Sequence, residues 1–232
     1  MAVNDLDMDQ ISSKARIYEI WAALRRMYGP KENETRDPLD VLVLTILSQN
    51  TTDVNRDRAF KSLRARFSSW DEVRMADPFL VENAIRMGGL ARIKAARIRQ
   101  ALERIKADFG ECSLKGLERM TPERRLEYLL SLDGVGDKTA RCVLLFGYGY
   151  GAFPVDTHIY RVSRRLGLIP EKADLPLAHK ILGEMIPPHL AYETHVNMIE
   201  HGRKRCRPRN PRCGECELAS LCPFPRHRAS PG

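Results

Sequence analysis

Apolar residues recur along most of this chain at the spacing of amphipathic helices. The first clear run starts at Ile17, repeats its apolar positions every three or four residues, and ends at Gly29-Pro30. Runs of the same kind predict further helices over residues 39–47, 53–67, 91–109, 121–130, 138–146, 156–166, 175–186 and 191–205, with one or two short helices within 70–86. No β pattern is present in the sequence, so it predicts an all-α protein.

The segment 39–47 is the one place where a buried strand competes with a helix. It is rich in β-branched residues, which favour strands. The preceding pair Asp37-Pro38, however, has the form of an N-cap followed by proline at the first helical position. This cap and the length of the apolar run favour a helix.

A glycine hairpin, Gly134-Val135-Gly136, joins the predicted helices 121–130 and 138–146. Glycine tolerates the left-handed backbone of a tight reversal and allows another backbone to approach closely. At the start of the second helix several N–H groups lack partners and the helix dipole is positive, which suits a phosphate group. Such a contact would hold a nucleic-acid strand without reading its bases.

Two ionisable residues follow the hairpin at positions suited to chemistry. Lys138 lies just inside the helix start, where a positive helix end near a dry pocket disfavours its charged form and frees a nucleophilic amine. Asp156 stands where the next helix should begin, and an aspartate at an N-cap is expected to stay ionised. An amine that attacks a sugar carbon, with a carboxylate that stabilises developing positive charge, suits cleavage of a C–N glycosidic bond. Each feature alone is usually an ordinary turn, surface lysine or cap, and only their combination favours catalysis.

Four cysteines near the C-terminus, Cys206, Cys213, Cys216 and Cys222, can converge on one centre. A zinc site of this kind normally needs two separated ligand pairs. This chain has a single C-x-x-C flanked by lone cysteines on longer loops, which suits the four corners of a [4Fe–4S] cluster better. Zinc is the second interpretation and disulfides are the third.

Three arginines, Arg207, Arg209 and Arg212, lie between the first two cysteines, among prolines that stiffen the loop. Arginines bind phosphates well, so the cysteine centre can support a contact with a DNA backbone. A purely structural role, in which the centre holds the end of the chain together, is compatible with this interpretation.

Composition narrows the partners and the compartment. The chain has 232 residues, a formal net charge of +8 and a pI of about 9.3. This charge suits a polyanionic partner, but charge alone does not distinguish such a protein from a generic basic one. No apolar run reaches the length of about 18 residues that a membrane span needs, and the first ten residues lack the apolar core of a signal peptide. We therefore expect a protein that is cytoplasmic and associated with the nucleoid, or otherwise intracellular. We expect it not to bind membranes and to act as a monomer.

Taken together, Gly134-Val135-Gly136, Lys138-Thr139-Ala140, Val155-Asp156-Thr157-His158 and the cysteine spacing resemble the endonuclease III family of DNA glycosylase/lyases, within the helix-hairpin-helix superfamily. The resemblance implies two helical lobes. A six-helix barrel with the hairpin would cover residues 31–150, and a discontinuous iron–sulfur cluster domain would cover 1–30 and 151–232. The active site would lie in the cleft between these lobes.

The resemblance also implies roles for single residues. Lys138 would be the Schiff-base nucleophile and Asp156 the catalytic carboxylate. Gln49 matches the glutamine that fills the space left by an extruded base, and Leu90, after a double glycine, matches the wedge that enters the opposite strand. The hairpin would bind DNA through Gly134, Val135 and Gly136.

The function implied is a bifunctional DNA glycosylase/AP lyase that removes damaged bases, by default oxidised pyrimidines, from double-stranded DNA. A uracil or mismatch-thymine glycosylase of the same fold is the alternative within this class. A non-catalytic DNA-binding module and a redox sensor built on the cluster are alternatives from other classes. The pair Lys138 and Asp156 argues against the module, because gripping a phosphate does not need it.

The hairpin departs from the commonest family pattern in its charges. Asp133 stands where the family usually has proline, and Asp137 follows the second glycine. Acidic groups beside a phosphate site are unfavourable, although Asp137 could cap the helix. The run Asn50-Thr51-Thr52 after Gln49 also differs from the usual version, which leaves the preferred lesion open.

Overall fold

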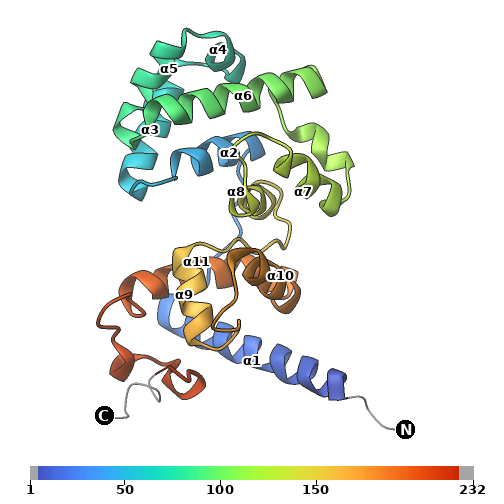
Figure 1. Ribbon diagram of the computed structural model, residues 1–232, viewed down its shortest axis with the longest axis vertical. Helices are drawn as coiled ribbons and strands as arrows, with labels where there is room; N and C mark the ends of the chain where they lie inside the picture. Colours follow the sequence, from blue (N-terminus) through green and yellow to red (C-terminus); the bar gives the residue numbers. More distant parts are fainter. Residues whose placement is uncertain (1–4, 225–232) are drawn as a thin grey trace. The chain divides into compact units, whose positions relative to one another are not determined.

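The computed structural model describes residues 5–224, with side chains from residue 15 onward, and is all-α, as the sequence predicts (Figure 1). Within these residues there are eleven α-helices and no β-strand. The α-helices are α1 (Asp5–Tyr28), α2 (Pro38–Leu47), α3 (Asp53–Arg66), α4 (Trp70–Met75), α5 (Pro78–Ala84), α6 (Ala91–Phe109), α7 (Pro122–Leu130), α8 (Asp137–Cys142), α9 (Thr157–Arg165), α10 (Leu175–Met185) and α11 (Pro188–Lys204). Shorter turns are the 3₁₀ helices η1 (Arg86–Gly88), η2 (Lys115–Arg119), η4 (Cys213–Glu215) and η5 (Ala219–Leu221), and the π-helix η3 (Val143–Gly147).

The described chain divides into two compact units. The insert unit is Glu34–Tyr150, and the terminal unit takes the residues up to Asn33 and from Gly151 onward. The sequence places its lobe boundaries at residues 30/31 and 150/151, and the assignment of a barrel and a cluster domain to these lobes stays a prediction. Residues 1–4 and 225–232 of the predicted cluster domain lie outside the described part.

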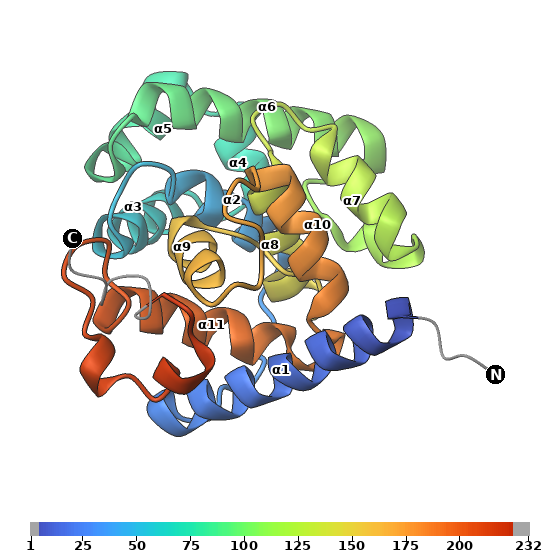
Figure 2. The same cartoon turned by 60° about the horizontal axis from the view of Figure 1, so that its bottom comes forward.

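Helix α2 forms the core of the insert unit. The carboxylate of Asp37 accepts hydrogen bonds from the backbone N–H groups of Leu39 and Asp40 at 2.9 and 3.2 Å, and Pro38 occupies the first turn. Most residues of α2 are buried because the helix is apolar on all sides. It packs against α3, α6, α8 and η3 (Figures 1 and 2). The segment 39–47 is therefore a helix, and the competing strand interpretation is wrong.

The helix predicted over residues 138–146 is only partly α-helical. The α-helix α8 ends at Cys142, and the widened turn of η3 continues to Gly147. Here the chain approaches the start of α2 closely, since a Cβ atom on Gly147 would lie 2.9 Å from the Cα atom of Pro38. The N–H group of Arg36 also donates to the carbonyl of Phe146 at 2.9 Å. Glycine at position 147 thus allows η3 to pack on the beginning of α2.

In the terminal unit, α11 packs against α1 and α9 (Figure 2). The α1 helix ends at Tyr28, and Gly29 follows with a positive φ of 78°. The side-chain amide of Asn197 on α11 donates to the carbonyl of Gly29 at 3.2 Å, and Lys31 pairs with Glu200 at 3.4 Å. The segment after α1 is therefore held to α11. None of the described helices combines the length and the apolar character needed to cross a membrane.

Replacing Gly147 by alanine should destabilise the insert unit. The new methyl group would push against the backbone of Pro38, and such overpacking typically costs about 1–3 kcal/mol of unfolding free energy. Denaturant unfolding measures the change. Gly214→Ala is the control, because nothing lies within 4 Å of the added Cβ there. Equal stability of the two variants would contradict the close approach.

Candidate functional site

The hairpin before α8 has the backbone that its glycines predict. Gly134 has a φ of 77°, and the N–H group of Val135 donates to the carbonyl of Leu132 at 3.1 Å to close the turn. The side chain of Val135 is buried, so any contact of the hairpin with a ligand must use backbone groups. Gly136 is the N-cap of α8, with no side-chain cap, which leaves the first N–H groups of the helix without a capping side chain.

Asp137 does not cap α8, and the suggestion that it does is wrong. It is the first residue inside the helix, one position too late, and its carboxylate lies 3.7 Å from the guanidinium of Arg141. Lys138 follows at the second position of α8 and is half-buried, whereas Thr139 and Ala140 face the core. The amine of Lys138 therefore belongs to the same turn as the uncapped N–H groups.

Gln49 stands in the short loop that leaves α2. Its N–H group donates to the carbonyl of Ile46 at 3.3 Å, and the next residue, Asn50, has a positive φ of 51°. Arg97 on α6 donates from Nη1 to Oε1 of Gln49 at 2.6 Å. The structure thus gives Gln49 a fixed partner that the sequence did not predict.

Leu90 is the N-cap of α6 and has the left-handed backbone, with a φ of 50° and a ψ of 35°. Leucine rarely adopts this conformation, and strain of this kind concentrates at functional sites. Its side chain is about half exposed, as are those of Met87 and Ile93 on either side. The loop therefore presents an apolar tip to solvent, as a wedge requires.

Lys94 on α6 is buried, although a lysine side chain is usually exposed to solvent. Its side chain is only 1% exposed, and Nζ donates to the carbonyls of Leu47 and Gly88 at 2.8 and 2.9 Å. Burial lowers the pKa of Lys94. The signal was present in the spacing, because Lys94 lies one turn before Ile98 and two before Leu102 on the buried face. Lys94 joins the end of α2 to the loop that carries Leu90.

In the terminal unit, Asp156 is the N-cap of α9, as predicted. Its Oδ1 atom accepts from the N–H group of Ile159 at 2.8 Å, and the residue is half-buried. This single bond fixes the direction of the carboxylate at the start of the helix. Lys138 and Asp156 belong to different units, and the facing arrangement of the two stays a prediction.

Arg161 on α9 connects the first turn of that helix to the cysteine loop. Its guanidinium donates to the carbonyl of Cys206 at 2.9 Å, to that of Gly202 at 2.8 Å and to Nδ1 of His158 at 3.1 Å. A Cβ atom on Gly202 would lie 2.9 Å from Cβ of His158, so glycine is needed for this approach. Arg161 was not among the predicted site residues.

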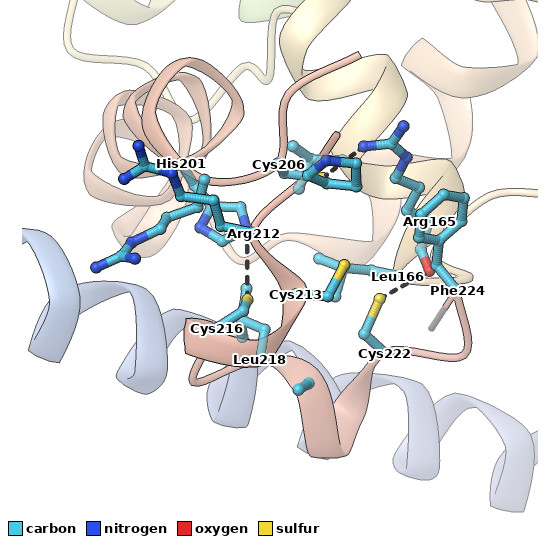
Figure 3. A pocket seen from close by; sticks show the side chains of 14 residues that line it. Arg165, Leu166, His201, Cys206, Arg212, Cys213, Cys216, Leu218, Cys222 and Phe224 are labelled. Carbon is cyan, nitrogen blue, oxygen red and sulfur yellow. Dashed lines mark hydrogen bonds between the residues drawn. The ribbon is translucent and has the colours of Figure 1, made fainter. Parts of the chain in front are cut away.

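The four cysteines line one pocket in the terminal unit, as Figure 3 shows. Arg165 donates to Sγ of Cys206 at 3.3 Å, and the ring of His201 lies 3.9 Å from Sγ of Cys216. Within the described residues no group of three His, Cys, Asp or Glu side chains is spaced to hold a single metal ion. Four thiols beside an arginine fit an iron–sulfur cluster, since its thiolate ligands are anionic and gain from hydrogen-bond donors near sulfur.

The arginines of the cysteine loop face solvent. Arg207, Arg209 and Arg212 are all exposed. Arg165 holds the loop backbone, because it donates to the carbonyls of Arg207 and Pro208 at 2.7 and 3.1 Å. The loop therefore presents three cations on a fixed backbone, as a phosphate contact requires.

Comparisons with known proteins agree with this geometry. Residues 43–188 match the HhH-GPD superfamily of base excision DNA repair proteins, and residues 206–222 match the iron–sulfur binding domain of endonuclease III. Endonuclease III of Thermotoga maritima is 36% identical over 203 residues, which cover 86% of this chain and 89% of that protein. A relative from Arabidopsis thaliana, provisionally named a DNA glycosylase, is 40% identical over 172 residues. This match covers 74% of this chain and 59% of the relative.

Among solved structures, a trapped covalent intermediate of endonuclease III with DNA has a TM-score of 0.79 and 29% sequence identity, over 94% of this chain and 99% of that one. The fold and the matched segments define a base excision DNA glycosylase with an iron–sulfur binding domain. The chain belongs to the endonuclease III family. The resemblance, the fold class and the iron–sulfur cofactor predicted from the sequence are thereby confirmed.

Acid should destabilise the terminal unit through His158. Burial lowers the pKa of His158 in the folded protein below its ordinary value of 6.5, so the unfolded chain binds this proton more readily. Stability that is fully present above pH 6.5 is therefore lost as the pH falls below it. His158→Gln removes the titration and keeps an acceptor for Arg161. Its melting temperature should fall less between pH 7 and 5 than that of the wild type, and parallel curves would contradict the assignment.

Proposed function

We propose that the protein is a bifunctional DNA glycosylase/AP lyase that removes a damaged base from duplex DNA and then cuts the strand at the abasic site. The observation that carries the proposal is the position of Lys138 in the first turn of α8, directly after the hairpin, where the helix has no capping side chain. The solved relative named above was trapped as a covalent intermediate with DNA, which supports a nucleophilic enzyme side chain. An enzyme with this substrate would act inside the cell, where the DNA is.

The reaction begins with the base extruded from the stack. The amine of Lys138 attacks C1′ of the sugar, the C1′–N bond breaks, and the base leaves with the bonding electrons and takes up a proton. The carboxylate of Asp156 stabilises the positive charge that develops at C1′ and the ring oxygen, as in glycoside hydrolysis. The cap bond from Ile159 holds this carboxylate at the start of α9.

The second step cuts the strand. The C1′–O4′ bond then breaks, the nitrogen lone pair forms a Schiff base between C1′ and Nζ of Lys138, and O4′ takes up a proton given up by the amine. A proton then leaves C2′, and the C3′–O bond breaks, so that the 3′ phosphate departs by β-elimination. Water finally hydrolyses the Schiff base and restores the amine. An oxidised pyrimidine is the substrate that the family resemblance favours.

The remaining predicted residues are assigned to the DNA. Gln49 fills the space of the extruded base, Leu90 enters the opposite strand, and the backbone of the hairpin holds a phosphate. Arg207, Arg209 and Arg212 bind the backbone further along the duplex. Cys206, Cys213, Cys216 and Cys222 would hold the iron–sulfur cluster, which would supply a rigid attachment for this loop. Arg161 connects the loop to α9, the helix that Asp156 caps.

Lys138→Ala should abolish covalent capture. Without the amine no Schiff base forms, so borohydride reduction with abasic-site DNA should give no adduct above background. Gel analysis of the trapped complex measures this. Lys172→Ala, which removes an exposed lysine, is the matched control and should trap normally. Full trapping by the Lys138 variant would refute the assignment.

Asp156→Asn should separate charge from structure. Asparagine caps a helix as well as aspartate does, so the fold and DNA affinity should persist. Loss of the negative charge should slow base removal by roughly 10²–10³-fold, the usual effect of removing one electrostatic stabiliser. Single-turnover kinetics on a duplex with one thymine glycol give the rate, and an unchanged rate would exclude the carboxylate from the mechanism.

A further inference from the structure

Arg97 lies between two segments that the proposed function assigns to DNA. Its Nη1 atom donates to Oε1 of Gln49 at 2.6 Å. Its aliphatic stem lies against the hairpin, since a Cβ atom on Gly134 would lie only 2.8 Å from Cδ of Arg97. The side chain is half-buried and comes from α6, which neither the hairpin nor the Gln49 loop belongs to. Arg97 is therefore placed to relate these two segments.

The chemistry of the pair fixes the orientation of the glutamine amide. A guanidinium has donors only, so the atom of Gln49 that faces it must be the carbonyl oxygen. The amide NH₂ group is then the end of Gln49 left for another partner, and no protein group accepts from it within the described residues. Gln49 thus offers a hydrogen-bond donor to whatever enters beside it.

The backbone of the same loop is fixed from the same helix. Lys94, one turn before Arg97 on α6, donates to the carbonyl of Leu47, two residues before Gln49. It also donates to the carbonyl of Gly88, two residues before Leu90. Helix α6 therefore holds the Gln49 loop by its backbone through Lys94 and by its side chain through Arg97.

We propose that Arg97 is a positioning residue that presets Gln49 for entry into the duplex and makes its free NH₂ end the one that meets the base opposite the lesion. This inference rests on the proposed function, in which Gln49 occupies the space of the extruded base. A preset side chain does not have to be ordered on binding, and ordering one flexible side chain weakens binding by about 2- to 12-fold.

The fixed orientation does not by itself select the opposite base. A side chain in the space of the extruded base faces the Watson–Crick edge of the opposite base, where guanine O6 and adenine N1 can each accept one hydrogen bond from the NH₂ group. We therefore expect Arg97 to contribute similarly opposite either purine.

The test uses the cluster-containing, full-length protein and duplexes with a tetrahydrofuran abasic analogue opposite guanine or adenine. Fluorescence anisotropy gives the affinity of the wild type, Arg97→Met, Gln49→Ala and the double variant. Arg97→Lys keeps one donor toward Oε1 and should retain more of the affinity than Arg97→Met. Arg92→Met removes a charge from an exposed arginine of the same helix and controls for general phosphate binding. Thermal unfolding checks that each variant is folded.

We expect Arg97→Met to weaken binding by about 2- to 12-fold opposite either purine, and to add nothing in the Gln49→Ala background. At saturating abasic DNA, Arg97→Met should be trapped by borohydride at the same rate as the wild type. Arg92→Met should lower both affinities equally, or not at all.

A loss that persists when Gln49 is alanine would overturn the inference, because Arg97 would then act on a phosphate or on the fold. Gln49→Ala with unchanged affinity and normal trapping would also overturn it. A wild type that forms no trapped adduct would instead refute the proposed function, so the two failures are distinguishable.

Discussion

A buried ammonium group fixes the loops of the insert unit. Lys94 is almost inaccessible to solvent, and a charge or polar donor in that position is tolerated only when protein acceptors replace water. Its acceptors are the carbonyl of Leu47, the last residue of α2, and that of Gly88, the last residue of η1. Helix ends leave such carbonyls without partners and carry a partial negative charge. One side chain thus satisfies both helix ends and holds the Gln49 and Leu90 loops to a common point.

In the terminal unit, too, a basic side chain donates to backbone carbonyls at and just beyond a helix end. Arg161 donates to the carbonyl of Gly202, in the last turn of α11, and to that of Cys206 just beyond it. Its own helix, α9, begins at the cap residue Asp156. One guanidinium therefore connects the cysteine loop to the helix that Asp156 caps. The position of the cysteine loop thus bears on the helix that Asp156 caps as well as on the exposed arginines.

The sequence predicts features that depend on neighbouring residues along the chain. The pair Asp37-Pro38 marks a helix start, and the periodic apolar run predicts the observed bounds of α6. The contacts of Arg97 and Arg161 could not be predicted, because they depend on how a helix face docks against a distant loop. The π-turn of η3 likewise reflects close packing against α2 and has no local signature.

Lys94 marks the limit between these two cases. The spacing of Lys94 from the apolar residues of α6 predicts a buried position, whereas its charge predicts a solvated one. The side chain is buried because it satisfies the carbonyls at two helix ends. The two lysines differ in their surroundings: Lys94 has its amine engaged by two carbonyls, and Lys138 stands half-buried beside an uncapped helix start. We propose the nucleophilic role for Lys138.

Mapping the site of covalent attachment tests this division most directly. Wild-type protein is reduced with borohydride on abasic-site DNA, digested with nuclease and protease, and analysed by mass spectrometry. The account predicts that the reduced sugar fragment is found on the peptide containing Lys138, attached at that residue. Attachment at Lys94, or at any other amine, would contradict it.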